Sequence, residues 1–253
     1  MENNEIKKEN KKALPLFIAV IAISAVVGFV LGLASVFVEH SDKIGELGVL
    51  FGKYVAPCLM VALAVVVPLL SVPKYRSAKK ILQGWDGEDE EVYEKADSKL
   101  STVIYTTSVA LIISYFLLTA SYSVGSDNVS IFTAVAIIGF AAIMVEAILL
   151  QQRAVDAVKS TNPEKKGSVY DMRFQKKWLE SCDEAEKAMI GQCAYKAYQT
   201  TNTVCAVLAV ILALSAIIFS TGFLPSLAVC IIWLANTSAY MREAKRIGAG
   251  VEL

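Results

Sequence analysis

The chain has 253 residues, of which 55% are hydrophobic, and its 24 basic and 24 acidic side chains give a formal net charge of zero. This composition, with a mean hydropathy of +0.52, fits a membrane bundle that carries modest polar segments. The balanced charge provides no basic excess to attract nucleic acid, which we therefore exclude as a partner.

Six long apolar stretches predict the fold class. They cover residues 14–38, 50–72, 103–122, 129–150, 203–221 and 223–240. Each is close to or above the ~20 residues that a helix needs to cross the ~30 Å hydrocarbon core. Backbone polar groups find no water in lipid, so such stretches must be helical. We expect an all-α, polytopic membrane bundle of six transmembrane helices in three hairpins, which forms a single membrane domain over residues 1–253.

The first two predicted spans carry features of helix packing and bending. In the first, Ser24, Gly28 and Gly32 recur at four-residue spacing, and such small side chains allow two helices to approach closely. Its apolar run is about twice as long as that of a secretory signal, so we expect an anchor that is retained. In the second, Pro57 and Pro68 predict kinks, because proline lacks the backbone donor.

The polar segment 73–102 contains an acidic run at residues 86–91. One interpretation is a site for a divalent cation or a basic partner. The favoured one is a solvated loop and helix start, because the run lacks the spacing of an EF-hand. After it, Ala96, Leu100 and Val103 continue a helical repeat that begins at Val92. The helix of the third span is therefore predicted to begin well outside the membrane.

Glu146 is the one ionisable residue clearly inside a predicted span, about 6 Å from its end at 1.5 Å per residue. A carboxylate at such a depth is a candidate for a proton or cation path. The alternative is that it reaches headgroup water or pairs with Arg153.

Hydroxyl and amide side chains also lie inside the spans. They either line a polar path or hydrogen-bond between helices and to their own backbone, and the sequence leaves both open. These residues are Thr106, Thr107, Ser108, Ser114, Asn202, Thr203 and Asn236.

The polar segment 151–202 holds the most informative motifs outside the membrane. The breaker 160–163, which ends in Pro163, and the nearby Gly167 predict a flexible loop at 159–168. The sequence Ser181-Cys-Asp-Glu184 matches a capping box, which predicts the start of the helix that leads into the fifth span.

A short aromatic and basic helix is predicted at residues 170–179. Phe174 and Trp178 are one helical turn apart, and Arg173, Lys176 and Lys177 lie beside them. This composition favours a helix that lies on an anionic inner leaflet or contacts a partner. The alternative is a helix that packs against the protein's own membrane-proximal ends.

The distribution of basic residues predicts the topology. All but Lys43 and Lys53 fall in the segments 1–13, 73–102, 151–202 and 241–253. Basic residues concentrate on the cytoplasmic side, so both termini and these four segments are predicted to be cytoplasmic.

The segments that follow the second, fourth and sixth spans begin with similar residues, an arginine followed by small and then aliphatic side chains. A threefold repeat of a two-helix unit explains this, and so does the general preference for arginine at membrane exits.

Motifs of catalysis are missing from the sequence. His40 is the only histidine, so one chain cannot assemble a histidine-based metal site. Phosphate-binding glycine motifs are also missing. The five cysteines have no CxxC spacing, and we expect free thiols. We therefore predict no enzymatic activity and no cofactor.

The chain resembles a family of bacterial membrane proteins known as domain of unknown function 3169. The resemblance covers roughly residues 12–247 and is carried by the six spans, the pairs Asp89-Glu90 and Asp183-Glu184, and the entry Lys99-Leu100-Ser101. It implies a bacterial plasma membrane and six helices, and it carries over no site residue.

Two classes of function follow from these features. The first is a non-catalytic accessory, immunity or regulatory protein, which acts in the bilayer through association with a membrane protein or with further copies of itself. The second is a transporter of a small solute or ion that uses Glu146 and the kinked second span.

Overall fold

The computed structural model describes residues 7, 8, 10–19, 22, 23, 26, 50–123, 131–219 and 223–248, with the side chains of 123, 214–219 and 248 left out. Within this part of the chain no strand occurs. Seven helices have described bounds, and residues 7, 8 and 10–19, which we call the N-terminal segment, are also helical. The chain divides into two compact units, Met1–Cys182 and Asp183–Leu253. The all-α class is thus confirmed, whereas the single membrane domain stays a prediction.

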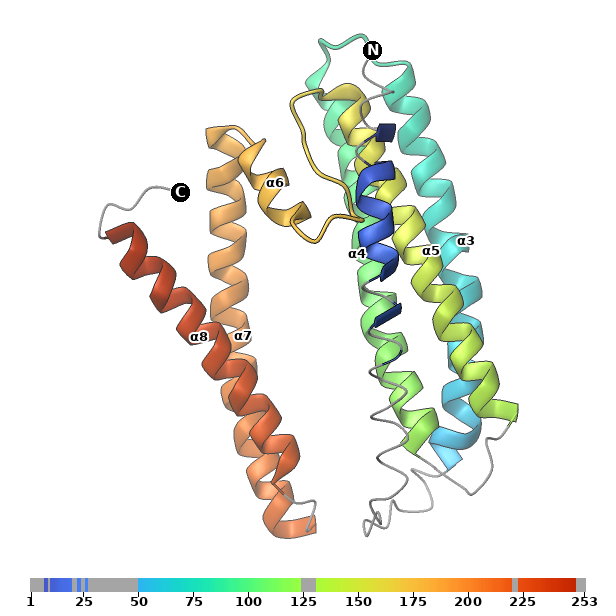
Figure 1. Cartoon of the computed structure of the whole chain (residues 1–253), viewed down its shortest axis with the longest axis vertical. Coiled ribbons are helices and arrows are strands. Elements are labelled where there is room, and N and C mark those ends of the chain that lie inside the picture. The colour runs from blue at the N-terminus through green and yellow to red at the C-terminus, as the bar shows by residue number, and fades with distance from the viewer. Residues whose placement is uncertain are drawn as a thin grey trace. The chain divides into compact units, whose positions relative to one another are not determined.

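The first unit is a bundle of three long helices (Figure 1). Its elements are the π-helix η1 (Phe51–Val55), α3 (Ala56–Gln83), α4 (Glu90–Ser123), α5 (Ile131–Thr161) and the short α6 (Phe174–Glu180). Helices α3, α4 and α5 contact one another pairwise. Because α3 and α5 each run antiparallel to α4, they are parallel to each other (Figure 1).

Two apolar clusters hold this bundle together. The first lies where α3 and α5 end and α4 begins, and we call this end of the unit the charged end. It contains Ala78, Leu82, Ala96, Leu100, Ala154, Ala157 and Val158. The second cluster lies further along the bundle and contains Ala56, Met60, Val67, Ala110, Leu117 and Ile143. Ala96, Leu100 and Val103 are fully buried, so the predicted extension of the third span's helix is confirmed.

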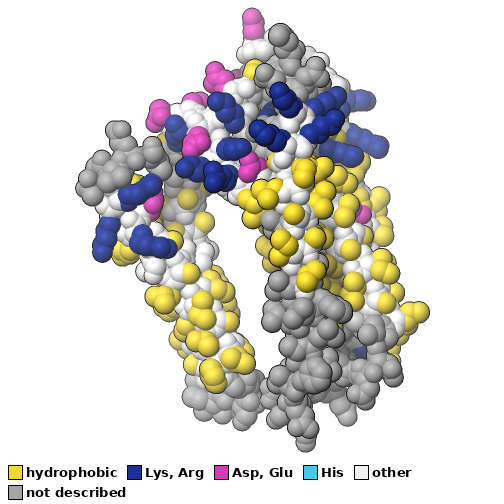
Figure 2. All heavy atoms as spheres, in the orientation of Figure 1, with side chains coloured by type: hydrophobic (Ala, Val, Ile, Leu, Met, Phe, Trp, Pro, Cys, Tyr) yellow, Lys and Arg dark blue, Asp and Glu magenta, His cyan; other side chains and the backbone are white. Residues whose placement is uncertain are grey.

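The outer surface of the bundle is apolar below the charged end. Large side chains such as Ile112, Ile131 and Ile138 are exposed. Figure 2 shows hydrophobic side chains along these helices and lysines and arginines gathered at the charged end. A soluble protein rarely exposes so much contiguous apolar surface, whereas hydrocarbon accommodates it. This pattern is typical of a membrane protein.

Four helices are long and apolar enough to cross a membrane. They cover Phe51–Gln83, Glu90–Tyr122, Ile131–Thr161 and Leu224–Ile247 of the described residues. They coincide with the predicted second, third, fourth and sixth spans. Most of the first span lies outside the described residues, including Ser24, Gly28 and Gly32. The fifth falls in α7, which is not among the four, and its last two residues also lie outside.

Proline shapes the start of α3. Pro57 lacks a backbone N–H and its ring crowds the carbonyl four residues earlier, so regular α-helix is disfavoured there. The preceding residues form the π-helix η1, whose wider turn ends where the amide of Ala56 donates to the carbonyl of Phe51. Pro68 and Pro73 lie inside α3.

The second unit is a helical hairpin of α7 (Glu184–Phe219) and α8 (Leu224–Gly248). The amide of Asn236 donates to Asn202 at 3.2 Å, and the rings of Tyr198 and Tyr240 stack at 4.3 Å. Among the described side chains of this unit, Cys205 is the buried one.

The capping box of α7 lies two residues later in the chain than predicted, at Asp183 and Glu186. Asp183 Oδ1 accepts the amide of Glu186 at 2.7 Å, and Glu186 Oε2 accepts the amide of Asp183 at 3.0 Å. This reciprocal pair is a capping box. Ser181 instead accepts the amide of Lys166 at 3.0 Å, so its hydroxyl is engaged by the loop before α6.

Close contact between α3 and α5 depends on Gly139. A Cβ at this position would lie 2.7 Å from Cγ of Met60, closer than van der Waals contact allows.

We expect Gly139→Ala to lower the free energy of unfolding by about 1–3 kcal/mol, the usual cost of overpacking. Gly191→Ala is the matched control, because no atom lies within 4 Å of a Cβ there and alanine favours helix. Thermal unfolding of detergent-solubilised protein measures both, and an unchanged midpoint for Gly139→Ala would contradict this packing.

Candidate functional site

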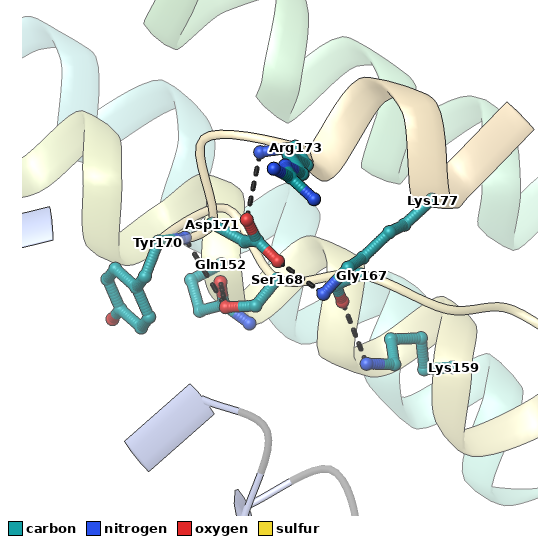
Figure 3. A network of polar contacts seen from close by, with 8 residues as sticks. All are labelled: Gln152, Lys159, Gly167, Ser168, Tyr170, Asp171, Arg173 and Lys177. Carbon is teal, nitrogen blue, oxygen red and sulfur yellow. Dashed lines mark hydrogen bonds and ion pairs between the residues drawn. The ribbon is translucent and has the colours of Figure 1, made fainter. Parts of the chain in front are cut away.

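The charged end is organised around the side-chain amide of Gln152, which is only 4% exposed. Its Oε1 accepts from the hydroxyl of Ser168 at 3.1 Å (Figure 3). It also accepts from the amide of Val169 at 2.8 Å. Its Nε2 donates to Asp156 at 2.8 Å and to Asn10 at 3.1 Å. One side chain of α5 therefore fixes both the loop 162–173 and the segment around Asn10.

A second buried polar group holds the middle of the same loop. Lys159, 3% exposed, donates from Nζ to the carbonyl of Gly167 at 2.8 Å (Figure 3). Gly167 has a φ of 113°, a conformation that side chains with a Cβ rarely adopt. A Cβ there would also lie 3.0 Å from the ring of Phe174, so the glycine lets α6 fold closely over the loop.

The end of α6 is fastened to the loop in a similar way. Lys165 is buried and lies 5.7 Å above the centroid of the Trp178 ring, within the range of a cation–π contact. Its Nζ also lies 3.4 Å from Sγ of Cys182. All five cysteines are free thiols, as predicted.

The start of α6 depends on Asp171. Its carboxylate accepts from Lys177 Nζ at 2.5 Å and from the amide of Arg173 at 2.8 Å (Figure 3). The hydrogen bond from Lys177, the amide of Arg173 and their positive charges lower the pKa of Asp171 against a smaller effect of burial. The charged form of the carboxylate therefore stabilises the first turn.

The residues predicted at 170–179 are divided between two faces. Trp178 packs against the cluster at the charged end, and Phe174 contacts Trp178 with ring centroids 5.6 Å apart. Arg173 and Lys176 are exposed, whereas Lys177 is half-buried. The aromatic pair thus adopts the arrangement of the alternative interpretation, packing on the protein itself. Contact of the basic residues with a leaflet or partner stays a prediction.

The predicted flexible loop is shorter and more ordered than expected. Residues 159–161 belong to α5, which ends at Thr161. The loop that follows buries Lys165, Gly167 and Ser168. Hydrogen bonds that a breaker motif cannot reveal explain this order.

Glu146 lies on α5, seven residues after Gly139, and residues seven apart share one helical face. That face contacts α3, because Gly139 packs on Met60. One carboxylate oxygen of Glu146 is buried without a hydrogen-bond partner among the described residues. The described ion pairs do not join it to Arg153.

Polar residues of the spans make hydrogen bonds, as one of the two interpretations expects. Thr107 donates to the carbonyl of Val103 at 2.9 Å, and Gln151 donates to Thr107 and to Ser108, both at 3.2 Å. The bond from Thr107 to Val103 lies within α4, whereas the two bonds from Gln151 connect α5 to α4.

The acidic run before α4 acts as a turn and cap. Asp86 accepts the amides of Glu88 and Asp89, which lower its pKa, and Asp89 accepts those of Glu91 and Val92. Among the described residues no group of three His, Cys, Asp or Glu side chains is placed to hold a metal ion. The carboxylates instead satisfy free amides of a helix start.

Sequence reasoning missed Gln152, Lys159 and Lys165. Gln152 could have been identified from the polar pair Gln151-Gln152, which directly follows an apolar stretch. The two lysines carried no signal, because a lysine in a polar segment is usually solvated.

Lys159→Met keeps the aliphatic stem and removes the donor to the Gly167 carbonyl. A hydrogen bond from a charged group contributes about 1.5–3 kcal/mol. We expect amide hydrogen exchange in residues 162–173 to accelerate by at least about tenfold. Lys176→Met is the control, since Lys176 is exposed and lies 3.7 Å from Glu180. Equal protection in Lys159→Met and the native chain would exclude a structural role for Lys159.

Acid is expected to loosen α6 through Asp171. Its pKa is lowered in the folded chain, so its stabilisation is complete at neutral pH and is lost as the pH falls below about 4. In a variant with Trp178 as the only tryptophan, fluorescence should report this transition, and Asp171→Asn should abolish it. Glu180→Gln, which changes an exposed carboxylate, should retain it. A transition that persists in Asp171→Asn would assign it to another group.

Comparison with known proteins identifies the family. The family model described as Protein of unknown function (DUF3169) matches residues 7–244. No curated protein and no solved structure matches the chain. The matched region includes every helix described above except the last four residues of α8. The chain belongs to the DUF3169 family.

Proposed function

We propose that the chain is a multi-pass protein of the bacterial plasma membrane that acts through protein association and not through catalysis. Its role is that of an accessory, immunity or regulatory protein. We further propose that the chain has six spans in three hairpins and that both termini lie in the cytoplasm. This topology places nearly all basic residues on the cytoplasmic side of the membrane.

One observation carries this proposal: an exposed surface on α6 and the turn before it, which the hydrogen bonds of Asp171 hold in shape. This surface, the α6 surface, consists of Met172, Arg173, Lys176 and Leu179, and Met172 is 65% exposed. Methionine and arginine are enriched in protein interfaces. The hydrogen bonds of Asp171 order the surface in advance, which reduces the entropy lost on binding.

The inward position of the aromatic residues favours a protein over a leaflet as the partner. A helix that lies in the headgroup region inserts its aromatic side chains among the lipids. Here Trp178 packs on the apolar cluster and Phe174 on Trp178. The exposed side chains are those of Met172, Arg173, Gln175, Lys176, Leu179 and Glu180. Glu180 lies 3.7 Å from Lys176, and together these charged, polar and apolar groups suit a protein surface.

Photo-crosslinking in the native host tests the association. A crosslinking amino acid at Met172 should give one stoichiometric adduct, and the same amino acid at exposed Lys79 on α3 should not. The pair Arg173→Glu and Lys176→Glu should remove the adduct, since it reverses both charges of the α6 surface. An adduct of twice the chain mass would identify a homo-oligomer.

Two results would contradict the proposal. One is the absence of an adduct from Met172 in folded, membrane-inserted protein. The other is equal yield from Lys79, which would show random collision at the charged end. Unchanged thermal unfolding of the double variant serves as the folding control.

Transport of a proton or small cation is the second candidate function. The observation that favours it is the buried carboxylate oxygen of Glu146, which has no hydrogen-bond partner among the described residues. A carboxylate oxygen buried on the α3-facing side of α5 without a partner is costly in a membrane unless a solute or proton uses it.

In proteoliposomes, Glu146→Gln should reduce ion-driven proton flux by at least about tenfold, since the amide cannot bind and release a proton at neutral pH. Glu180→Gln, a change in an exposed carboxylate of α6, should leave flux unaltered. Equal flux in Glu146→Gln and the native chain would exclude this carboxylate from transport.

A further inference from the structure

A pocket of about 610 Å³ lies at the charged end between α5 and the N-terminal segment. Four cations line it: Lys7, Lys8, Lys11 and Arg153. Asp156 is the one carboxylate among its lining residues. The pocket therefore carries an excess of positive charge, and no carboxylate of the described residues forms an ion pair with Arg153.

The wall of the pocket is fixed by polar contacts. Asn10 donates to both oxygens of Asp156, at 3.2 and 3.3 Å, and Gln152 donates to the same carboxylate at 2.8 Å. These bonds hold Asp156 at the wall, where it forms no ion pair with Arg153 among the described contacts. Phe17 and Tyr170, whose ring centroids are 5.5 Å apart, hold the N-terminal segment to the loop.

Tyr170 adds a polar group to the pocket. Burial, followed by the negative charge of Asp156, raises the pKa of its hydroxyl, and Arg153 opposes this in part. The hydroxyl is therefore protonated at neutral pH and is a hydrogen-bond donor for an anion.

The pocket also has an apolar side. Leu14 and Leu149 line it, and both belong to the apolar stretches predicted to enter the membrane. Cations and a hydroxyl on one side, with leucines on the other, match a molecule that has an anionic head and a hydrocarbon tail. A free phosphate ion would leave the leucines unused.

We propose that this pocket binds the headgroup of one anionic phospholipid, whose phosphate is held by Lys8, Lys11 and Arg153 while its acyl chains lie along Leu14 and Leu149. Arginine offers two parallel donors to phosphate oxygens, and basic pockets between membrane helices recognise anionic headgroups. The bound lipid bridges the N-terminal segment and α5 at the membrane boundary.

Native mass spectrometry of the full chain in detergent tests this site. Phosphatidylglycerol should bind as a single molecule at least about tenfold more tightly than phosphatidylcholine. Lys11→Gln combined with Arg153→Gln should abolish this preference. Lys79→Gln combined with Lys80→Gln, two exposed lysines at the end of α3, should preserve it.

Three outcomes would overturn the proposal. They are equal binding of both lipids, an equal loss in the two double variants, and displacement of phosphatidylglycerol by inorganic phosphate at equal concentration. The last would assign the pocket to a free ion. Retained helical content by circular dichroism establishes that both variants are folded, and the α6 surface is unchanged in each.

Discussion

The architecture of the charged end depends on a buried amide, that of Gln152. An amide taken out of water costs about 1–3 kcal/mol for each group left without a partner. Here both ends are satisfied: the carbonyl oxygen by Ser168 and Val169, and the nitrogen by Asp156 and Asn10. Because these partners come from three separate segments, the amide can be satisfied only when all three are in place.

This constraint determines which side chains remain available for function. Gln152 and Lys159 hold the loop before α6 in place. As a result, Trp178 packs against the apolar cluster and Arg173 is exposed. Fixing Asn10 places the N-terminal lysines beside Arg153. The surface proposed for a protein partner and the pocket proposed for a lipid thus both depend on the side chain of Gln152.

Features that depend on local periodicity could be predicted from the sequence. Ala96, Leu100 and Val103 repeat at helical spacing, so their buried face and the extension of α4 could be read directly. The capping box was displaced by two residues because both Ser181 and Asp183 are good caps, and only the contact of Ser181 with Lys166 decides between them. Burial of Lys159 depends on the carbonyl of Gly167 in the loop after α5, and the periodicity of a helix does not predict such a contact.

Two of the ionisable groups on helix α5, Lys159 and Glu146, have different environments. Lys159 is buried and donates to the Gly167 carbonyl, so its charge is used to hold a loop. Glu146 has a buried oxygen without a partner in the described chain. Structural polar groups in native proteins are nearly always satisfied, and an unsatisfied one requires a separate explanation. The same helix therefore fixes the charged end through Lys159. About three and a half turns before Lys159 it carries a carboxylate, that of Glu146, whose position packing alone does not explain.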